Sequence, residues 1–157
     1  MKMHIQSIGN TEILKYRKIA FLCSREIPAS VVLKCYDWAI ERRNAGDCVI
    51  SGFHSKIEKD VFHYLLAGTQ PIIMALARGL KDKFEPRIQE AINNGRLLVV
   101  TPFEKDIKRI TSDIAEKRNR FMVEFSDEVA IGYASKGGML EKLVGRINEK
   151  KKYMINP

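Results

Sequence analysis

Short apolar runs alternate with longer segments of mixed character along the chain, starting near residue 18. An apolar run of a few residues, bounded by turn residues, is typical of a strand that is buried on both faces. We predict strands at 18–23, 48–50, 71–76, 96–101, 128–133 and 153–155.

The segments between these runs carry apolar residues three or four positions apart, which is the spacing of one helix face. Val31, Cys35 and Trp38 follow this spacing, and Gly46 ends the pattern. Ser55 and Glu58 have the spacing of a capping box, which opens a helix. We predict helices at 28–45, 55–67, 86–94, 111–125 and 139–148.

Strands separated by helices require right-handed crossover connections, which produce a mainly parallel sheet with helices on both faces. The predicted fold is therefore a Rossmann-like three-layer α/β/α sandwich with about six strands. No linker, repeat or low-complexity segment interrupts residues 1–157, so we expect a single domain. Residues 1–17 precede the first predicted strand as a polar lead-in.

The composition excludes several classes of protein. Of the 157 residues, 45% are hydrophobic and 29% are charged, as in an average globular domain. No apolar run approaches the roughly 20 residues of a membrane helix, and the start of the chain lacks the features of a signal peptide. Cys23, Cys35 and Cys48 form no CxxC pair, which argues against a disulfide framework or a zinc site. We expect a cytoplasmic protein with reduced cysteines, no membrane segment and no metal.

The formal net charge of +8 and the isoelectric point near 9.5 favour a polyanionic partner. Clustered Lys and Arg gain free energy by releasing the counterions that condense on phosphates. A basic surface that serves only solubility has the same composition. Both interpretations stay open, because the sequence does not show which charges gather in space.

The residues that follow each strand are the first candidates for chemistry, because the ligand of an open parallel sheet lies beyond the carboxyl ends of the strands. Ser24, Arg25 and Glu26 follow the first predicted strand. The Arg25 guanidinium can direct two donors at a phosphate, and the start of the next helix adds free N–H groups. In the alternative, Arg25 is exposed and pairs with Glu26.

The loop after the second predicted strand combines a tight turn with a helix start. Gly52 permits close approach of the backbone to a ligand, and Ser51 can donate to a phosphate oxygen. Ser55 can cap the next helix whether or not the turn binds an anion. The His54 imidazole titrates near neutrality, but no Asp, Glu or Ser stands at a spacing that requires a catalytic triad. We expect His54 at the surface or at the edge of a ligand.

After the fifth predicted strand, Lys136, Gly137 and Gly138 have the ingredients of an anion cradle. They do not form a P-loop, and no GxGxxG follows the first strand, so we expect no dinucleotide cofactor. Arg118 and Arg120 lie in the preceding helix. They reach the site if that helix begins there, whereas their spacing alone favours ordinary solvated positions.

Taken in order, these loops resemble the DprA/Smf family of DNA-processing proteins, whose Rossmann-like domain belongs to a wider group that includes the LOG cytokinin-activating enzymes. Residues 23–25 are similar to the family's GSR, and residues 51–58 are similar to its SGxxxGID turn. Residues 117–126 are similar to its FPxRNRIIAGLS segment, and residues 137–140 to its closing SGxL. The resemblance extends from Lys18 to the last residue.

The resemblance implies single-stranded DNA binding, a part in loading RecA, and a homodimer. The residues that it assigns to phosphate contacts are Ser24, Arg25, Ser51 and Gly52, and those that it assigns a structural or binding role are Arg118 and Arg120.

Three residues depart from the family pattern. Cys23 stands at the first glycine of GSR, Ser55 at an arginine of the second turn, and Lys56 at the glycine that follows it. The second turn is therefore bulkier and differently charged, so the family's mode of DNA binding does not transfer directly. The candidate nucleic-acid contacts are His54, Lys56, Arg118 and Arg120.

Our leading hypothesis is a non-catalytic domain, without a cofactor, that holds a phosphate of single-stranded nucleic acid or of a nucleotide. The predicted phosphate ligands are Ser24, Arg25, Ser51, Gly52, Ser55, Lys136, Gly137 and Gly138. One alternative is a LOG-like hydrolase of nucleoside 5'-monophosphates with Glu141 as its catalytic candidate, although residues 137–141 lack the proline, the later glycine and the threonine of PGGxGTxxE. Another alternative is a domain that only associates with other proteins.

Overall fold

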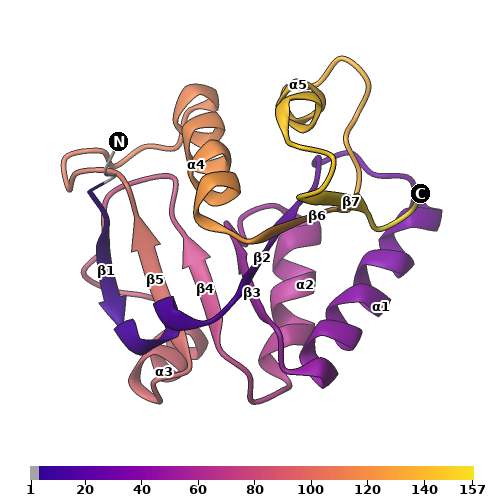
Figure 1. Ribbon diagram of the computed structural model, residues 1–157. Coiled ribbons are helices and arrows are strands. Elements are labelled where there is room, and N and C mark those ends of the chain that lie inside the picture. Colours follow the sequence, from indigo (N-terminus) through magenta and orange to yellow (C-terminus); the bar gives the residue numbers. More distant parts are fainter. Residues whose placement is uncertain (1–3) are drawn as a thin grey trace.

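A seven-stranded sheet lies between two layers of helices in the computed structural model, which describes residues 4–157 (Figure 1). The strands are β1 (Gln6–Gly9), β2 (Lys18–Leu22), β3 (Cys48–Ser51), β4 (Ile72–Ala75), β5 (Leu97–Thr101), β6 (Glu128–Ile131) and β7 (Lys152–Met154). Their order across the sheet is β1-β5-β4-β3-β2-β6-β7. All neighbours pair in parallel except β1, which is antiparallel to β5. The structure confirms the Rossmann-like α/β/α sandwich and adds one strand to the expected sheet.

Helices cover both faces of the sheet. One face packs against α1 (Ala29–Ala45), α2 (Lys56–Leu66) and α3 (Pro86–Asn93), and the other against α4 (Ser112–Phe125) and α5 (Met139–Arg146). Every residue of β2, β3, β4 and β5 is buried between these layers, which explains why their sequences are apolar runs rather than alternating patterns. No helix among the described residues has both the length and the apolar character to cross a membrane.

The predicted helix ends coincide with specific capping groups. In α2, Ser55 Oγ accepts from the backbone N–H of Glu58 at 3.4 Å, and the Glu58 carboxylate accepts from the N–H of Ser55 at 3.2 Å. The end of α1 is Gly46, whose φ of 78° lies in the left-handed region that favours glycine. α5 ends earlier than predicted, at Arg146, because Ile147 already has an extended backbone.

The segment before β2 contains more structure than a polar lead-in. β1 pairs with the edge of β5, and a 3-10 helix (Thr11–Lys15) then places Ile13 in the core. The sequence of β1 lacks a strand signal because its four residues have no apolar alternation, so the antiparallel ladder with β5 defines it. Residues 1–3 of the expected lead-in lie outside the described residues.

The strand order reverses beside β2. From β2 the sheet grows through β3 and β4 to β5, and α4 then returns the chain to β6 on the other side of β2 (Figure 1). The chain after β2 continues to a helix on one face of the sheet, and the chain after β6 continues to a helix on the other face. The two loops therefore diverge at the carboxyl edge of the sheet. Ligands of open α/β sheets bind at such a switch point.

Candidate functional site

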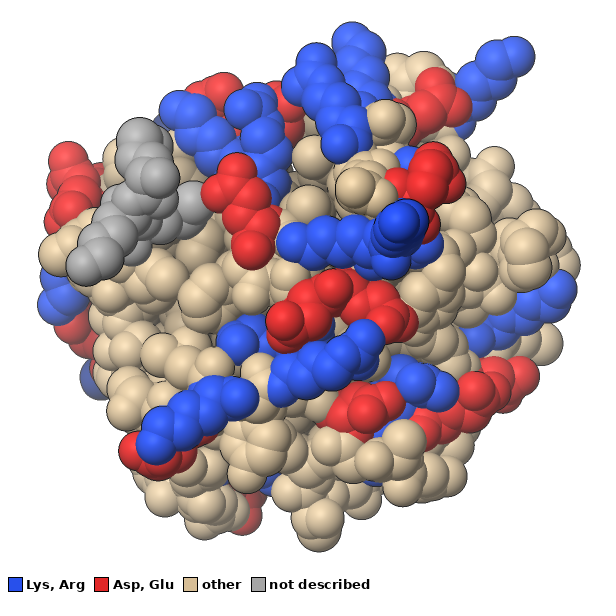
Figure 2. Space-filling model, in the orientation of Figure 1, with Lys and Arg blue, Asp and Glu red and all other residues tan. Residues whose placement is uncertain are grey.

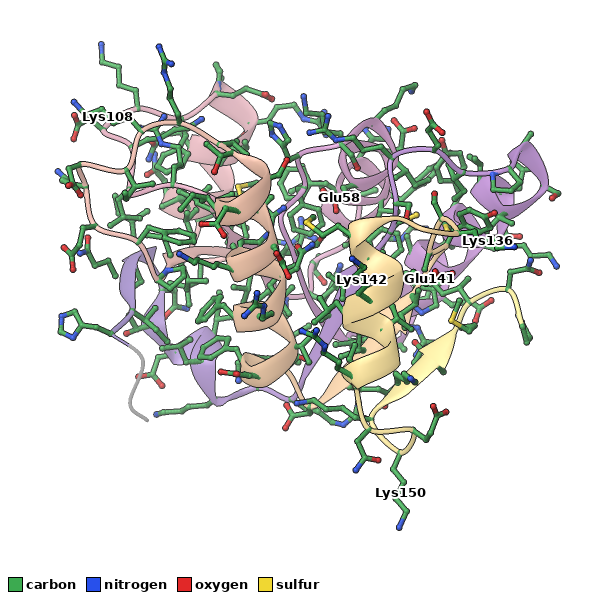
Figure 3. All side chains as sticks on the ribbon, turned by 90° about the horizontal axis from the view of Figure 1, so that it is seen from above. Glu58, Lys108, Lys136, Glu141, Lys142 and Lys150 are labelled. Atoms are coloured by element: carbon green, nitrogen blue, oxygen red, sulfur yellow. The ribbon has the colours of Figure 1, made fainter. Side chains whose placement is uncertain are left out.

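A cavity of about 550 Å³ opens at the switch point, on the edge of the sheet that Figure 3 shows from above. Its walls come from the loops after β2, β3 and β6, from α4 and from the segment before α4. The residues singled out from the sequence that line it are Ser24, Arg25, His54, Ser55, Arg118 and Gly138. Those that do not line it are Ser51, Gly52, Lys56, Arg120, Lys136, Gly137 and Glu141. The cavity thus brings together about half of the predicted set.

Hydrogen bonds join the loop after β2 to the loop after β6. Ser24 Oγ accepts from the backbone N–H of Ser135 at 2.9 Å, and Ser135 Oγ donates to the carbonyl oxygen of Glu26 at 3.1 Å. The backbone N–H of Ser24 donates to the carbonyl oxygen of Tyr133 at 2.8 Å. These bonds hold Ser24 in the cavity wall and hold the following residue, Arg25, at the rim.

Arg25 is exposed at this rim. Within residues 4–157 its guanidinium forms no ion pair, so the local pairing with Glu26 that the sequence left open is absent. The side chain is available to an anion that approaches the cavity.

Arg118 faces inward, which corrects the solvated position that its spacing favoured. Its side chain is only 6% exposed, with Nε donating to Asn119 Oδ1 at 3.0 Å and Nη1 donating to the carbonyl oxygen of Ala75 at 3.3 Å. Its Nη2 has no hydrogen-bond partner among residues 4–157. Arg118 is one of the residues that line the cavity, and Nη2 is not among the fully enclosed side-chain atoms of that range.

The guanidinium of Arg118 fits only because Gly52 lies beneath it. A Cβ on Gly52 would stand 2.1 Å from Nη1 of Arg118. Burial lowers the pKa of Arg118 and the nearby Glu58 carboxylate opposes this shift, but an arginine keeps its proton in either case. Arg120, two residues later, is exposed and pairs with Glu116 at 3.0 Å, so the two arginines have different environments.

Glu58 is a buried carboxylate in the cavity wall, near the centre of the edge seen in Figure 3. Its Oε1 accepts from the backbone N–H groups of His54 at 2.9 Å and of Ser55 at 3.2 Å. The capping-box spacing predicted the bond from Ser55 but not the one from His54. Its proximity to Arg118 depends on how α4 packs across the sheet, and no local sequence signal indicates it.

The His54 imidazole lies beside two positive charges. Burial lowers its pKa most, and the charges of Arg118 and Arg25 lower it further. The ring is therefore neutral at pH 7, with one nitrogen able to donate and one able to accept. Within residues 4–157, no group of three or more His, Cys, Asp or Glu side chains is arranged to hold a metal ion.

Ser51 and Gly52 do not line the cavity and instead contact residues beside it. Ser51 is fully buried, and its Oγ donates to the carbonyl oxygen of Phe21 at 3.0 Å, which ties β3 to β2. The next residue, Phe53, has a φ of 48° and packs against Phe62 with ring centroids 4.7 Å apart. This positive φ in a non-glycine residue had no signal in the sequence.

Local hydrogen bonds already occupy some backbone N–H groups of the loop after β6. Gly137, with a φ of 76°, donates its backbone N–H to Glu141 Oε1 at 3.0 Å, and Gly138 donates to the carbonyl oxygen of Ser135 at 3.0 Å. The Glu141 carboxylate therefore occupies the backbone N–H of Gly137, one of the donors expected to bind an anion. Glu141 itself does not line the cavity. Lys136 lies toward the side of the molecule in Figure 3, away from Glu58.

Charges of both signs share the molecular surface. Lys and Arg side chains are interspersed with Asp and Glu over the face shown in Figure 2. Among residues 4–157, several basic side chains form ion pairs with carboxylates. The net charge of +8 therefore does not gather into one uniformly basic face on this side. The cavity is itself lined by charges of both signs, namely the guanidiniums of Arg25 and Arg118 and the carboxylates of Glu26 and Glu58.

The topology places the chain in the class of Rossmann-like α/β folds, with a cavity at the switch point of the sheet. Within this class the structure is similar to DNA processing protein A, DprA. The protein from Helicobacter pylori matches with a TM-score of 0.75 and 23% identity, over 96% of this chain and 70% of its own. The protein from Streptococcus pneumoniae matches with a TM-score of 0.76 and 16% identity, over 96% of this chain and 53% of its own. The resemblance to DprA is thus confirmed for the fold.

The remaining comparisons give a weaker structural match and no sequence match. A molybdenum cofactor binding protein from the phototrophic bacterium Rippkaea orientalis matches with a TM-score of 0.60 and 11% identity, over 89% of this chain and 76% of its own. No protein-family model matches the sequence, and no curated protein does so.

Proposed function

We propose that the cavity binds a phosphate group of single-stranded nucleic acid or of a nucleotide, without altering it chemically. The buried side chain of Arg118 in the cavity wall is the observation that carries this proposal. A buried cation costs free energy unless an opposite charge compensates it. Glu58 compensates in part but lies beyond ion-pair distance, so a phosphate would complete the environment of Arg118.

Other donors surround the same space. Arg25 at the rim can direct two N–H groups at one phosphate, and the Ser24 hydroxyl lies in the wall. Gly138 is the N-cap residue of α5 and offers no side-chain cap, so the first N–H groups of this helix are available to an anion. The lining combines backbone donors and two cations, as phosphate sites do, with the carboxylates of Glu26 and Glu58, which reduce its net positive charge.

Two observations favour single-stranded nucleic acid over a free nucleotide. Ile110 and Met139 line the cavity although they are 41% and 39% exposed, and unpaired bases pack against such apolar side chains. The similar protein from Helicobacter pylori has a single-stranded DNA binding mode. We therefore take a single strand as the leading ligand.

The test of the proposal is a fluorescence titration with an oligothymidylate at two salt concentrations. Arg25→Ala should weaken binding about tenfold, because one charge-assisted hydrogen bond is worth about 1.5 kcal/mol. The slope of log affinity against log salt concentration should also become shallower by about one, the change expected when one phosphate contact is lost.

Arg120→Ala is the matched control, since it removes the same charge outside the cavity. Equal losses in the two variants would mean that general charge, not the cavity, holds the strand.

We do not extend the proposal to hydrolysis, because the candidate Glu141 lies outside the cavity with its carboxylate bound to Gly137. The homodimer and the cytoplasmic location that the sequence suggested stay predictions.

A further inference from the structure

The thiols of Cys23 and Cys35 lie close together beside the loop after β2, which forms part of the cavity wall. Cys23 follows β2, is half-buried and lines the cavity, whereas Cys35 lies in α1 and is fully buried. Their sulfurs stand 3.0 Å and 2.9 Å from the point where a Cβ of Gly132 would lie. The missing side chain of Gly132 thus leaves a space in which the two sulfurs are neighbours.

The two thiols interact with each other. The interaction with Cys35, together with burial, raises the pKa of Cys23, and the same interaction lowers the pKa of Cys35. Cys48, the remaining cysteine, is buried in the core on the other face of the sheet and lines no part of the cavity. The chain therefore contains one paired dithiol and one isolated thiol as an internal control.

We propose that Cys23 and Cys35 form a dithiol site that reacts with a low-molecular-weight disulfide entering through the cavity and becomes an intramolecular disulfide. Only Cys23 is accessible to such a reagent. A disulfide bond also requires the two sulfurs to close to about 2.05 Å, and they already share one space beside Gly132.

The reaction is a two-step thiol–disulfide exchange. Because the pKa of Cys23 is raised, its thiolate forms in quantity only at alkaline pH. This thiolate attacks one sulfur of the reagent RSSR, which forms a mixed disulfide and expels RS⁻, and RS⁻ takes up a proton from water to give RSH. The Cys35 thiolate then attacks the Cys23 sulfur, which forms the intramolecular disulfide and releases the second RSH. Two protein thiols are oxidised, and one reagent disulfide is reduced to two thiols.

The disulfide would also affect the cavity, a consequence that rests on the proposed phosphate site. Cys23 immediately precedes Ser24, whose Oγ holds the backbone of Ser135. Tying Cys23 to α1 pulls this segment away from the loop after β6 and displaces Arg25 from the rim. Oxidised protein should therefore bind an oligothymidylate more weakly than reduced protein.

The test treats the native 157-residue chain with 2-hydroxyethyl disulfide at alkaline pH, removes the reagent, denatures the protein and alkylates the remaining thiols. We expect the loss of two of the three alkylatable thiols, a mass lower by two hydrogens, and a peptide that links Cys23 to Cys35. Cys48→Ser should leave the reaction unchanged, whereas Cys35→Ser should stop at a mixed disulfide on Cys23.

Three alkylated thiols, a persistent mixed disulfide on Cys23 of the natural chain, or reaction at Cys48 would each overturn the dithiol site. The measurement on the natural chain decides this even if Cys35→Ser fails to fold. Oligothymidylate titration of the two forms is a separate readout. If the disulfide forms and both forms bind equally, the link to the cavity is wrong. If the disulfide forms and neither form binds, the dithiol stands and the proposed function is wrong.

Discussion

At the scale of single residues, the cavity depends on one close approach between a glycine and a guanidinium. Arg118 lies over Gly52 at a distance that leaves no space for a Cβ. The buried cation is then fixed by Asn119 and by the carbonyl oxygen of Ala75. Gly52 therefore acts on a ligand through Arg118 rather than by touching the ligand itself.

Gly52→Ala should lower the free energy of unfolding by about 1–3 kcal/mol, the usual range for overpacking, and should weaken oligothymidylate binding by displacing Arg118. Urea denaturation measures the first effect and fluorescence titration the second. Gly145→Ala is the control, because a Cβ there meets no atom within 4 Å and alanine favours the helix α5. An unchanged or higher stability of Gly52→Ala would contradict the close approach.

His54 should make binding depend on pH. Burial and the charges of Arg118 and Arg25 lower its pKa in the free protein, and a bound phosphate adds a negative charge that raises it. Binding is then linked to proton uptake, so affinity should increase as the pH falls through the pKa that His54 has in the complex. The measurement is the oligothymidylate dissociation constant between pH 5 and pH 8, where phosphodiesters do not titrate. His54→Gln should flatten the profile, and an identical profile would assign the dependence to another group.

At the scale of elements, the start of α2 links local helix capping to the electrostatics of the cavity. Ser55 and Glu58 form the capping box, and the same Glu58 carboxylate lies near Arg118. Such a carboxylate stabilises the helix start while it reduces the positive potential that a phosphate meets. The two effects can be separated because an amide oxygen still accepts hydrogen bonds but carries no charge.

Glu58→Gln should retain most of the capping bonds and remove the negative charge. We expect a small loss in thermal stability together with tighter oligothymidylate binding, since the field of Arg118 is then less compensated. Differential scanning fluorimetry and titration at low salt are the measurements. Weaker binding at full folding would mean that Glu58 contributes to the site by positioning a contact rather than by its charge.

The elements also show what the sequence could reveal. Apolar runs such as 97–101 and the signals at Ser55 and Gly46 act locally, so they predicted the helices and strands well. β1 was not predicted because it depends on a hydrogen-bonded ladder with β5, which is distant in sequence. Similarly, the inward position of Arg118 depends on which face of α4 meets the sheet, and periodicity in a short polar segment does not define that face.

At the scale of the whole molecule, strand order brings the chemical groups together. Arg25, His54 and Arg118 are far apart in sequence, and they meet because β2 is central and α4 crosses back to β6. The principle that ligands of open sheets lie beyond the carboxyl ends of the strands predicted, from sequence alone, several of the loops that line the cavity. It did not separate wall residues such as Ser24 from supporting residues such as Ser51, because that distinction depends on side-chain burial.

The most direct test of the phosphate-binding cavity is an NMR titration of the isotope-labelled protein with an oligothymidylate. The account predicts the largest shifts at the backbone N–H groups of Ser24 and Gly138 and at the Nε–H of Arg118. Gly95 and Arg96, which line a second cavity of about 350 Å³ formed by the loops before β4 and β5, should not shift. Shifts that are largest at the second cavity, or that spread evenly over the surface, would contradict the account.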